Sequence, residues 1–186
     1  QQCRKEWSTS TQYTYEDLTR LAGEAAPFRS LVDPDCSDFF HPRSMQESLQ
    51  TYCRRTSQPV PEKPAEHIRC ILESLALKYR VTLEQLRQLT GRRISRVHVI
   101  GGGSQNRLLC QYAANAMGVP VIAGPVEATA IGNIMMQAHA LGHVGSLAEI
   151  RSIVGQSFQP VRFEPKDQDI WNAAYIQFSS LTSMNQ

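Results

Sequence analysis

The stretch RVHVIGGGSQNRLLCQYAANAMG, Arg96 to Gly118, decides the fold class of this chain. It begins with a short run of β-branched apolar residues, which is typical of a strand buried on both faces. The run ends in Gly101, Gly102 and Gly103, after which apolar residues recur at helical spacing. The pattern therefore predicts a buried strand over 96–100, a tight turn, and a helix that begins at about Ser104.

A second short apolar run, VPVIAG at 119–124, follows this helix, and another helical pattern covers 127–142. Strand, helix, strand and helix in close succession indicate a parallel βαβ unit. Two strands are too few to form the core of a domain. We therefore expect an α/β fold that is rich in helices, with few strands, and that is part of something larger.

The rest of the chain is predicted to be mostly helical. Helical spacing and capping residues predict helices over 14–27, 44–55, 64–91, 147–155 and 166–181, and an extended segment over 160–165. One apolar stripe is expected to pack the longest helix into the core: Ile68, Leu72, Leu75, Tyr79, Leu83, Leu86 and Leu89. The last helix is expected to bury Ile170, Ala174, Phe178 and Leu181.

Composition is that of an ordinary globular domain. The 186 residues are 41% hydrophobic and 19% charged, with a net charge of +2, so charge does not favour a nucleic-acid partner. No apolar run reaches the length of a membrane span and no signal core precedes the first helix, so we expect a soluble cytoplasmic protein. The five cysteines form no CxxC pair and are expected to be unlinked, with Cys53 and Cys70 the pair to test.

The glycines are predicted to cradle phosphate. Ligands of α/β sheets bind at the carboxyl ends of strands, where glycine lets a ligand touch the main chain and a helix N-terminus favours an anion. Ser104 is a candidate helix cap or phosphate donor, and Asn106 can reach a phosphate or a ribose hydroxyl. A tight turn without a ligand is the alternative. The loop is neither a Walker loop nor a dinucleotide fingerprint, because Asn106 stands where the third glycine belongs.

Other candidate residues are weaker. Glu127 could bind a ligand, although starting the next helix is the favoured interpretation. His98 lies within a strand and is expected to be structural. No carboxylate pair stands beside the glycines to hold Mg²⁺, so no metal ligand is assigned within this chain.

Several linked motifs resemble the C-terminal part of the FGGY carbohydrate kinases. They are VHVIGGGSQNRLLCQYAANAMGVPVIAGPVEATAIGNIMMQ, the upstream helix RCILESLALKY and the loop DPDCSDFFHPRSM. The resemblance is strongest from Arg69 to Gln137. It implies an actin-like ATPase architecture, in which two ribonuclease-H-like domains hold ATP and a sugar in the cleft between them.

On this resemblance, residues 1–186 form an incomplete C-terminal domain, the nucleotide-binding half of the enzyme. The sugar-binding N-terminal domain and the catalytic aspartate would lie upstream, so no catalytic residue is expected here. Gly102 and Asn106 match the family's nucleotide contacts best, and Gly101, Gly103 and Ser104 share their loop. Gln1 is matched to a nucleotide-contacting glutamine.

The resemblance also implies the ligands of the whole enzyme. These are ATP with Mg²⁺ and a ketose, L-rhamnulose, phosphorylated on its 1-hydroxyl; the missing N-terminal domain is the expected protein partner. Two alternatives stay open: a family member acting on xylulose, fuculose or glycerol, and a non-catalytic actin-like module that binds ADP. An enzyme that binds a dinucleotide is disfavoured, because no acidic residue ends a second strand about 20 positions past the glycines.

Overall fold

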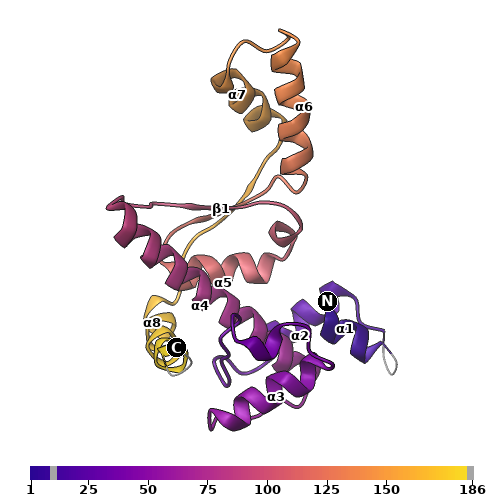
Figure 1. Cartoon of the computed structure of the whole chain (residues 1–186), viewed down its shortest axis with the longest axis vertical. Helices are drawn as coiled ribbons and strands as arrows, with labels where there is room; N and C mark the ends of the chain where they lie inside the picture. Colours follow the sequence, from indigo (N-terminus) through magenta and orange to yellow (C-terminus); the bar gives the residue numbers. More distant parts are fainter. Residues whose placement is uncertain (9–11, 184–186) are drawn as a thin grey trace.

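The computed structural model describes residues 1–8 and 12–183, and its centre is a small three-stranded sheet (Figure 1). The strands β1 (Val97–Val99), β2 (Val121–Ala123) and β3 (Val161–Phe163) lie in that order. β1 and β2 are parallel, with Val97 opposite Val121, which confirms the predicted βαβ unit. β3 pairs antiparallel with β2, so the segment expected only to be extended is a third strand.

The prediction that the first strand is buried on both faces is wrong. Val97 and Val99 pack against a buried cluster that includes Cys110 and Ala113 of α5 (Arg107–Met117), but they are only partly buried, and His98 is exposed. Ile100, just past the strand, is 56% exposed. The reason is that β1 forms the edge of the sheet and α5 covers one of its faces. An apolar strand with an open edge offers pairing groups to another strand.

The longest helix, α4 (Pro64–Thr90), begins and ends as its sequence predicts. Pro64 occupies the first turn, and Gly91 ends the helix in the left-handed conformation, with a φ of 64°. The predicted stripe buries Leu72 and Leu83, but Tyr79 between them is 38% exposed. At the C-terminal end the prediction fails, since Leu89 is 84% exposed. Figure 1 shows the cause: the C-terminal part of α4 runs past α5 and α8, which cover its middle.

The helix α5 packs along α4 through small side chains. Ala113, Ala114 and Ala116 are buried, and short side chains allow two helices to approach closely. Gly118 ends α5 with a φ of 64°. The packing of α5 against α4 therefore positions the sheet and the glycine turn, which adjoin α5.

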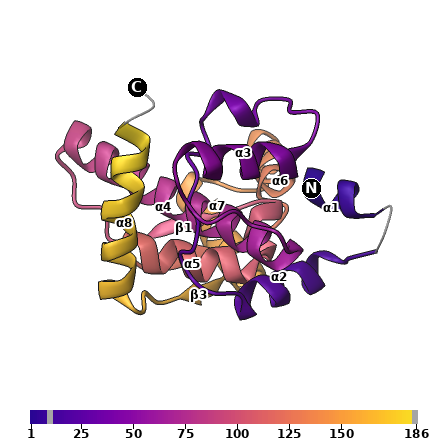
Figure 2. The same ribbon diagram turned by 90° about the horizontal axis from the view of Figure 1, so that it is seen from below.

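The last helix, α8 (Gln168–Ser183), lies beside α4 and α5 (Figure 2). Ala174 and Phe178 are buried as predicted, and Leu181 is partly buried. Ile170 is 56% exposed, and Trp171 is buried in its place. The Trp171 ring packs against Phe28 and Tyr112, with centroid distances of 4.8 and 5.3 Å. A shift of one residue turns a helix by about 100°, so the larger aromatic side chain decides the buried face.

Three helices pack around the first half of α4: α1 (Gln2–Trp7), α2 (Tyr15–Glu24) and α3 (Met45–Arg55). The sequence analysis did not predict α1. The sequence feature that indicates α1 is the apolar pair Cys3 and Trp7, which lie four residues apart and are both buried. Cys53 of α3 and Cys70 of α4 are buried unlinked thiols, and the neighbouring Cys53 thiol and burial together raise the pKa of Cys70.

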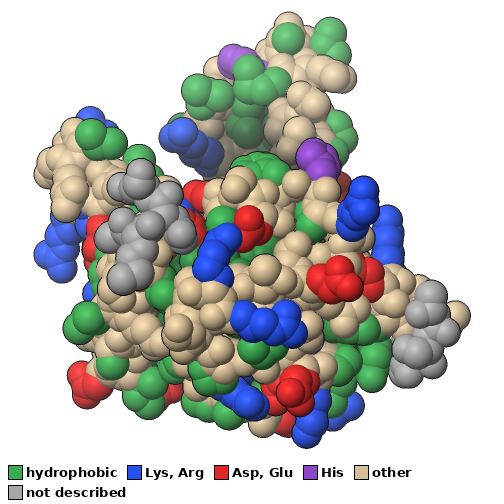
Figure 3. Space-filling view, turned by 60° about the horizontal axis from the view of Figure 1, so that its bottom comes forward, with side chains coloured by type: hydrophobic (Ala, Val, Ile, Leu, Met, Phe, Trp, Pro, Cys, Tyr) green, Lys and Arg blue, Asp and Glu red, His purple; other side chains and the backbone are tan. Residues whose placement is uncertain are grey.

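The helices α6 (Ala128–Ala140) and α7 (Leu147–Ser157) form a hairpin that projects from the body (Figures 1 and 3). None of the residues of α6 is buried, and Ile134 is 63% exposed. The small residues of α6 thus do not serve close packing within the described residues. Nor does any helix within 1–8 and 12–183 have the length and apolar character of a membrane span.

Acidification is expected to destabilise the fold through His67. This side chain is fully buried: Nδ1 donates to the carbonyl of Lys63 at 2.9 Å, the ring centroid lies 5.8 Å from that of Trp7, and Nε2 has no partner among the described residues. Burial lowers the pKa of His67, opposed by the bond to Lys63 and by the charges of Glu66 and Glu6. The folded chain therefore binds fewer protons than the unfolded chain, in which the pKa is about 6.5.

It follows that the free energy of unfolding should fall as the pH drops below about 6.5, the pKa of the unfolded chain's histidine. Urea unfolding at pH values from about 5 to 8 measures the effect. His67→Phe, which removes the titrating group but keeps an aromatic ring, should give a flatter profile. An equally steep profile in that variant would contradict the assignment.

Candidate functional site

The glycine turn after β1 presents open main chain. Gly101 has φ 74° and ψ −165°, a conformation that strains any other residue, and Gly102–Gln105 form a single 3-10 turn. A Cβ placed on Gly101, Gly102 or Gly103 would meet nothing within 4 Å. The first N–H groups of such a turn have no partner within it. The space in front of the glycines is therefore open to a ligand.

Ser104 holds the turn together instead of capping the helix. Its side chain is buried, and Oγ donates to the carbonyl of Gly101 at 2.7 Å. The prediction that Ser104 caps the helix is wrong, because an intervening 3-10 turn delays the helix to Arg107.

Asn106 is the helix cap. Its Oδ1 accepts the N–H of Leu109 at 3.0 Å, which satisfies one of the unpaired groups at the start of α5. Asn106 also lines a cavity formed mainly by the N-terminal helices. It therefore stands between the glycine turn and this cavity.

This cavity has a volume of about 390 Å³ and mostly apolar walls. Most of its lining comes from the four helices α1 to α4 and from the loop before α3: among these residues are Val32, Leu49, Ile68, Leu72 and Leu75. Gln1 lines it as well, so two predicted residues from opposite parts of the chain, Gln1 and Asn106, meet at one cavity. The volume is within the range of small-molecule sites.

Glu127 starts α6, as the favoured interpretation predicted. It is the exposed N-cap residue of α6, and its side chain makes no capping hydrogen bond. The turn before it lies beside the glycines, since the N–H of Gly101 donates to the carbonyl of Pro125 at 3.4 Å. Glu127 does not line the cavity.

The chemistry of the site is that of a binding surface. Within residues 1–8 and 12–183, no group of three or more His, Cys, Asp or Glu side chains could hold a metal ion. The side chains of the glycine turn and the cap, Ser104, Gln105 and Asn106, are neutral. Open amides, a helix N-terminus and an apolar cavity suit a ligand with an anionic end and an apolar end.

Among the cavity's lining residues that sequence reasoning missed are Arg4 and Tyr15. Arg4 of α1 places its guanidinium 4.2 Å from the ring centroid of Tyr15, the first residue of α2, and both line the cavity. No motif marked either residue. Recognising α1 from its apolar pair would have placed Arg4 on a helix, but not beside Tyr15.

The fold and the glycine turn are those of a known protein family. The family model described as FGGY family of carbohydrate kinases, C-terminal domain, matches residues 1–141, and the chain belongs to this family. It is 47% identical over 180 residues to a rhamnulokinase of Bacteroides thetaiotaomicron, covering 97% of this chain and 36% of that protein. The rhamnulokinase of Enterococcus faecalis is 44% identical, covering 91% of this chain and again 36% of the relative.

Solved structures confirm the fold. The xylulose kinase of Rhodospirillum rubrum superimposes with a TM-score of 0.66 at 18% identity, covering 98% of this chain and 36% of that one. The glycerol kinase of Plasmodium falciparum, solved with ADP, gives 0.67 at 13% identity, covering 92% and 34%. The chain thus has the actin-like ATPase fold of the sugar kinases, and spans about a third of the length of these relatives.

Proposed function

We propose that this chain is the nucleotide-binding part of a sugar kinase that transfers the γ-phosphate of ATP to the 1-hydroxyl of L-rhamnulose. The observation that carries the nucleotide site is the junction at Asn106, where the open glycine turn meets the apolar cavity. A nucleotide has the matching shape, with a charged polyphosphate joined to a flat, largely apolar base. The choice of sugar rests on the rhamnulokinase relatives.

In this proposal, the phosphates lie against Gly101, Gly102 and Gly103, and the base enters the cavity. Main-chain N–H groups and the α5 N-terminus would bind the polyphosphate without needing a lysine or arginine. Phosphoryl transfer depends mainly on positioning and on neutralising charge. The role of this chain is to hold ATP in line with a sugar hydroxyl that the rest of the protein presents.

Two further requirements of the reaction fall outside these residues. The Mg²⁺ that accompanies ATP would neutralise phosphate charge, but the described residues offer it no cluster of carboxylates. We propose that an aspartate accepts the sugar proton and that it lies in the part of the protein outside this chain, which spans 36% of the relative's length.

The chain is therefore proposed to be a partial domain whose partner is the N-terminal, sugar-binding part of the same protein. Two features support this: the chain spans 36% of the relatives, and β1 is an edge strand followed by an exposed Ile100. Further strands would pair at that edge and remove its unpaired backbone groups. Glu127 is kept as a minor candidate contact because its turn borders the glycines.

An assay of the intact protein tests the proposal. ADP release with ATP, Mg²⁺ and L-rhamnulose, D-xylulose, L-fuculose or glycerol should be fastest with L-rhamnulose, and the 186-residue chain alone should show none. Faster turnover of another sugar would overturn the substrate, and ADP binding without any turnover would favour a non-catalytic module. Asn106→Asp serves as a site variant: the carboxylate can still cap α5, but it repels phosphate.

A further inference from the structure

A guanidinium stacked on an aromatic ring lines the cavity. Arg4 stacks over the ring of Tyr15 at 4.2 Å, and both residues line the cavity that reaches Asn106. The two come from different helices, α1 and α2, so the pair exists only in the folded chain. Figure 1 shows these helices close to the N-terminus, with the start of α5 beside them.

This pair remains available to a ligand. Tyr15 is 52% exposed, so more than half of the residue has no covering neighbour. Among the described residues, no carboxylate forms an ion pair with Arg4, whereas six other arginines do pair: Arg20, Arg29, Arg55, Arg69, Arg80 and Arg162. An accessible ring and an unneutralised guanidinium together form a stacking surface for an electron-rich flat group.

We propose that Arg4 and Tyr15 select the base of the nucleotide, favouring a purine over a pyrimidine. This inference rests on the proposed function, because it takes the cavity to hold the base. A purine has two fused rings and covers more of the stacking surface than a pyrimidine does. With the phosphates at the glycine turn, Asn106 is the junction from which the base extends toward the pair.

Binding of ADP, CDP and pyrophosphate to the intact protein, measured by calorimetry, tests this inference. Tyr15→Leu and Arg4→Ala should each weaken ADP by about tenfold, which is the scale of one base-stacking contact, and should change CDP less. Pyrophosphate, which has no base, should bind as before. Tyr15→Phe keeps the ring and should bind ADP like the natural protein, which separates loss of stacking from a folding defect.

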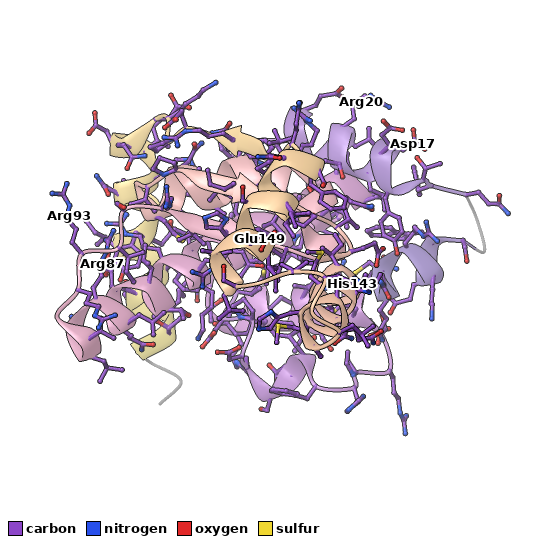
Figure 4. The ribbon with its side chains drawn as sticks, turned by 90° about the horizontal axis from the view of Figure 1, so that it is seen from above. Asp17, Arg20, Arg87, Arg93, His143 and Glu149 are labelled. Atoms are coloured by element: carbon purple, nitrogen blue, oxygen red, sulfur yellow. The ribbon has the colours of Figure 1, made fainter. Side chains whose placement is uncertain are left out.

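Two matched controls lie outside the cavity. Arg20→Ala removes an arginine from the exposed side of α2 (Figure 4), and Tyr79→Leu removes a partly exposed ring from α4. Both should leave ADP binding unchanged. If Tyr15→Leu and Arg4→Ala keep the natural ratio of ADP to CDP affinity, the proposal that this pair selects the base is wrong. That result would not contradict the nucleotide site itself. If the natural protein binds neither ADP nor pyrophosphate, both the base selection and the proposed nucleotide-binding function are wrong.

Discussion

Gly102→Val is expected to weaken ADP binding to the intact protein by about 100-fold, the scale of losing charge-assisted hydrogen bonds to phosphate. The position has open space where a Cβ would stand, and it lies in the middle of the glycine turn. A branched side chain there occupies the volume through which a phosphate would reach the main-chain N–H groups. Calorimetric titration with ADP and with pyrophosphate measures the loss, which should be similar for both.

The same substitution should change stability little, because the added side chain meets nothing within 4 Å and Gly102 does not have a left-handed φ. Gly101→Ala should behave differently: its φ of 74° strains any side chain, at a cost of roughly 1–3 kcal/mol in unfolding free energy. Gly155→Val, at another open glycine on α7, is the control and should bind ADP normally. Unchanged ADP affinity in Gly102→Val would contradict the proposal that the glycine turn binds phosphate.

Arg69→Leu is expected to cause the largest loss of stability, about 3–5 kcal/mol, because it leaves a buried carboxylate unpaired. Arg69 Nε lies 2.7 Å from Glu73 Oε1, and the two side chains are 12% and 1% exposed. Arg69 Nη1 also donates to the last carbonyls of α2 and the turn that follows: Ala22, Gly23 and Ala25. Glu73 Oε2 accepts the N–H of Phe28 at 2.8 Å. The pair thus joins α2 and the loop after it to α4.

The loss should grow with pH. Burial raises the pKa of Glu73, and Arg69 opposes that rise. Without Arg69, the folded-state pKa of Glu73 should rise further above the unfolded value of about 4.5, so the folded chain binds more protons than the unfolded chain. Stability contributed by protonated Glu73 is then present below about pH 4.5 and is lost as the pH rises through the folded-state pKa.

Urea unfolding at two pH values measures this prediction. The double variant Arg69→Leu with Glu73→Leu should recover part of the loss, because it removes the unpaired charge. Arg20→Leu is a matched control: Arg20 and Glu24 have the same spacing on a helix, but their side chains are 61% and 62% exposed. It should cost less than about 1 kcal/mol. A similar loss from Arg20→Leu and Arg69→Leu would contradict the role of burial.

Much of the secondary structure could be predicted from local signals. Short stretches of sequence encode the strands on either side of α5 and the helix ends at Gly91 and Gly118. They also encode the motifs of the carbohydrate kinase family. Helix ends are readable because glycine alone enters the left-handed conformation without cost. The turn at Gly101 to Gly103 is also readable from its glycines, and Gly101 has a left-handed φ of 74°.

The sequence-based predictions are wrong where contacts between residues distant in sequence, or the structure just before a helix, decide the outcome. Asn106 caps α5 in place of Ser104 because a 3-10 turn precedes the helix, and Trp171 is buried in place of Ile170 because Phe28 and Tyr112 receive its ring. A periodic pattern marks an apolar face only to within a residue, and packing decides which side chain fills the core.

The sequence by itself determined the class of fold, the family and the glycine turn, since each is encoded by residues adjacent in the chain. Only the tertiary structure decided that Gln1 and Asn106 line one cavity, and that Arg4 meets Tyr15 there. The physical reason is that a cavity is made by the packing of helices far apart in sequence, and no local pattern records which helices meet.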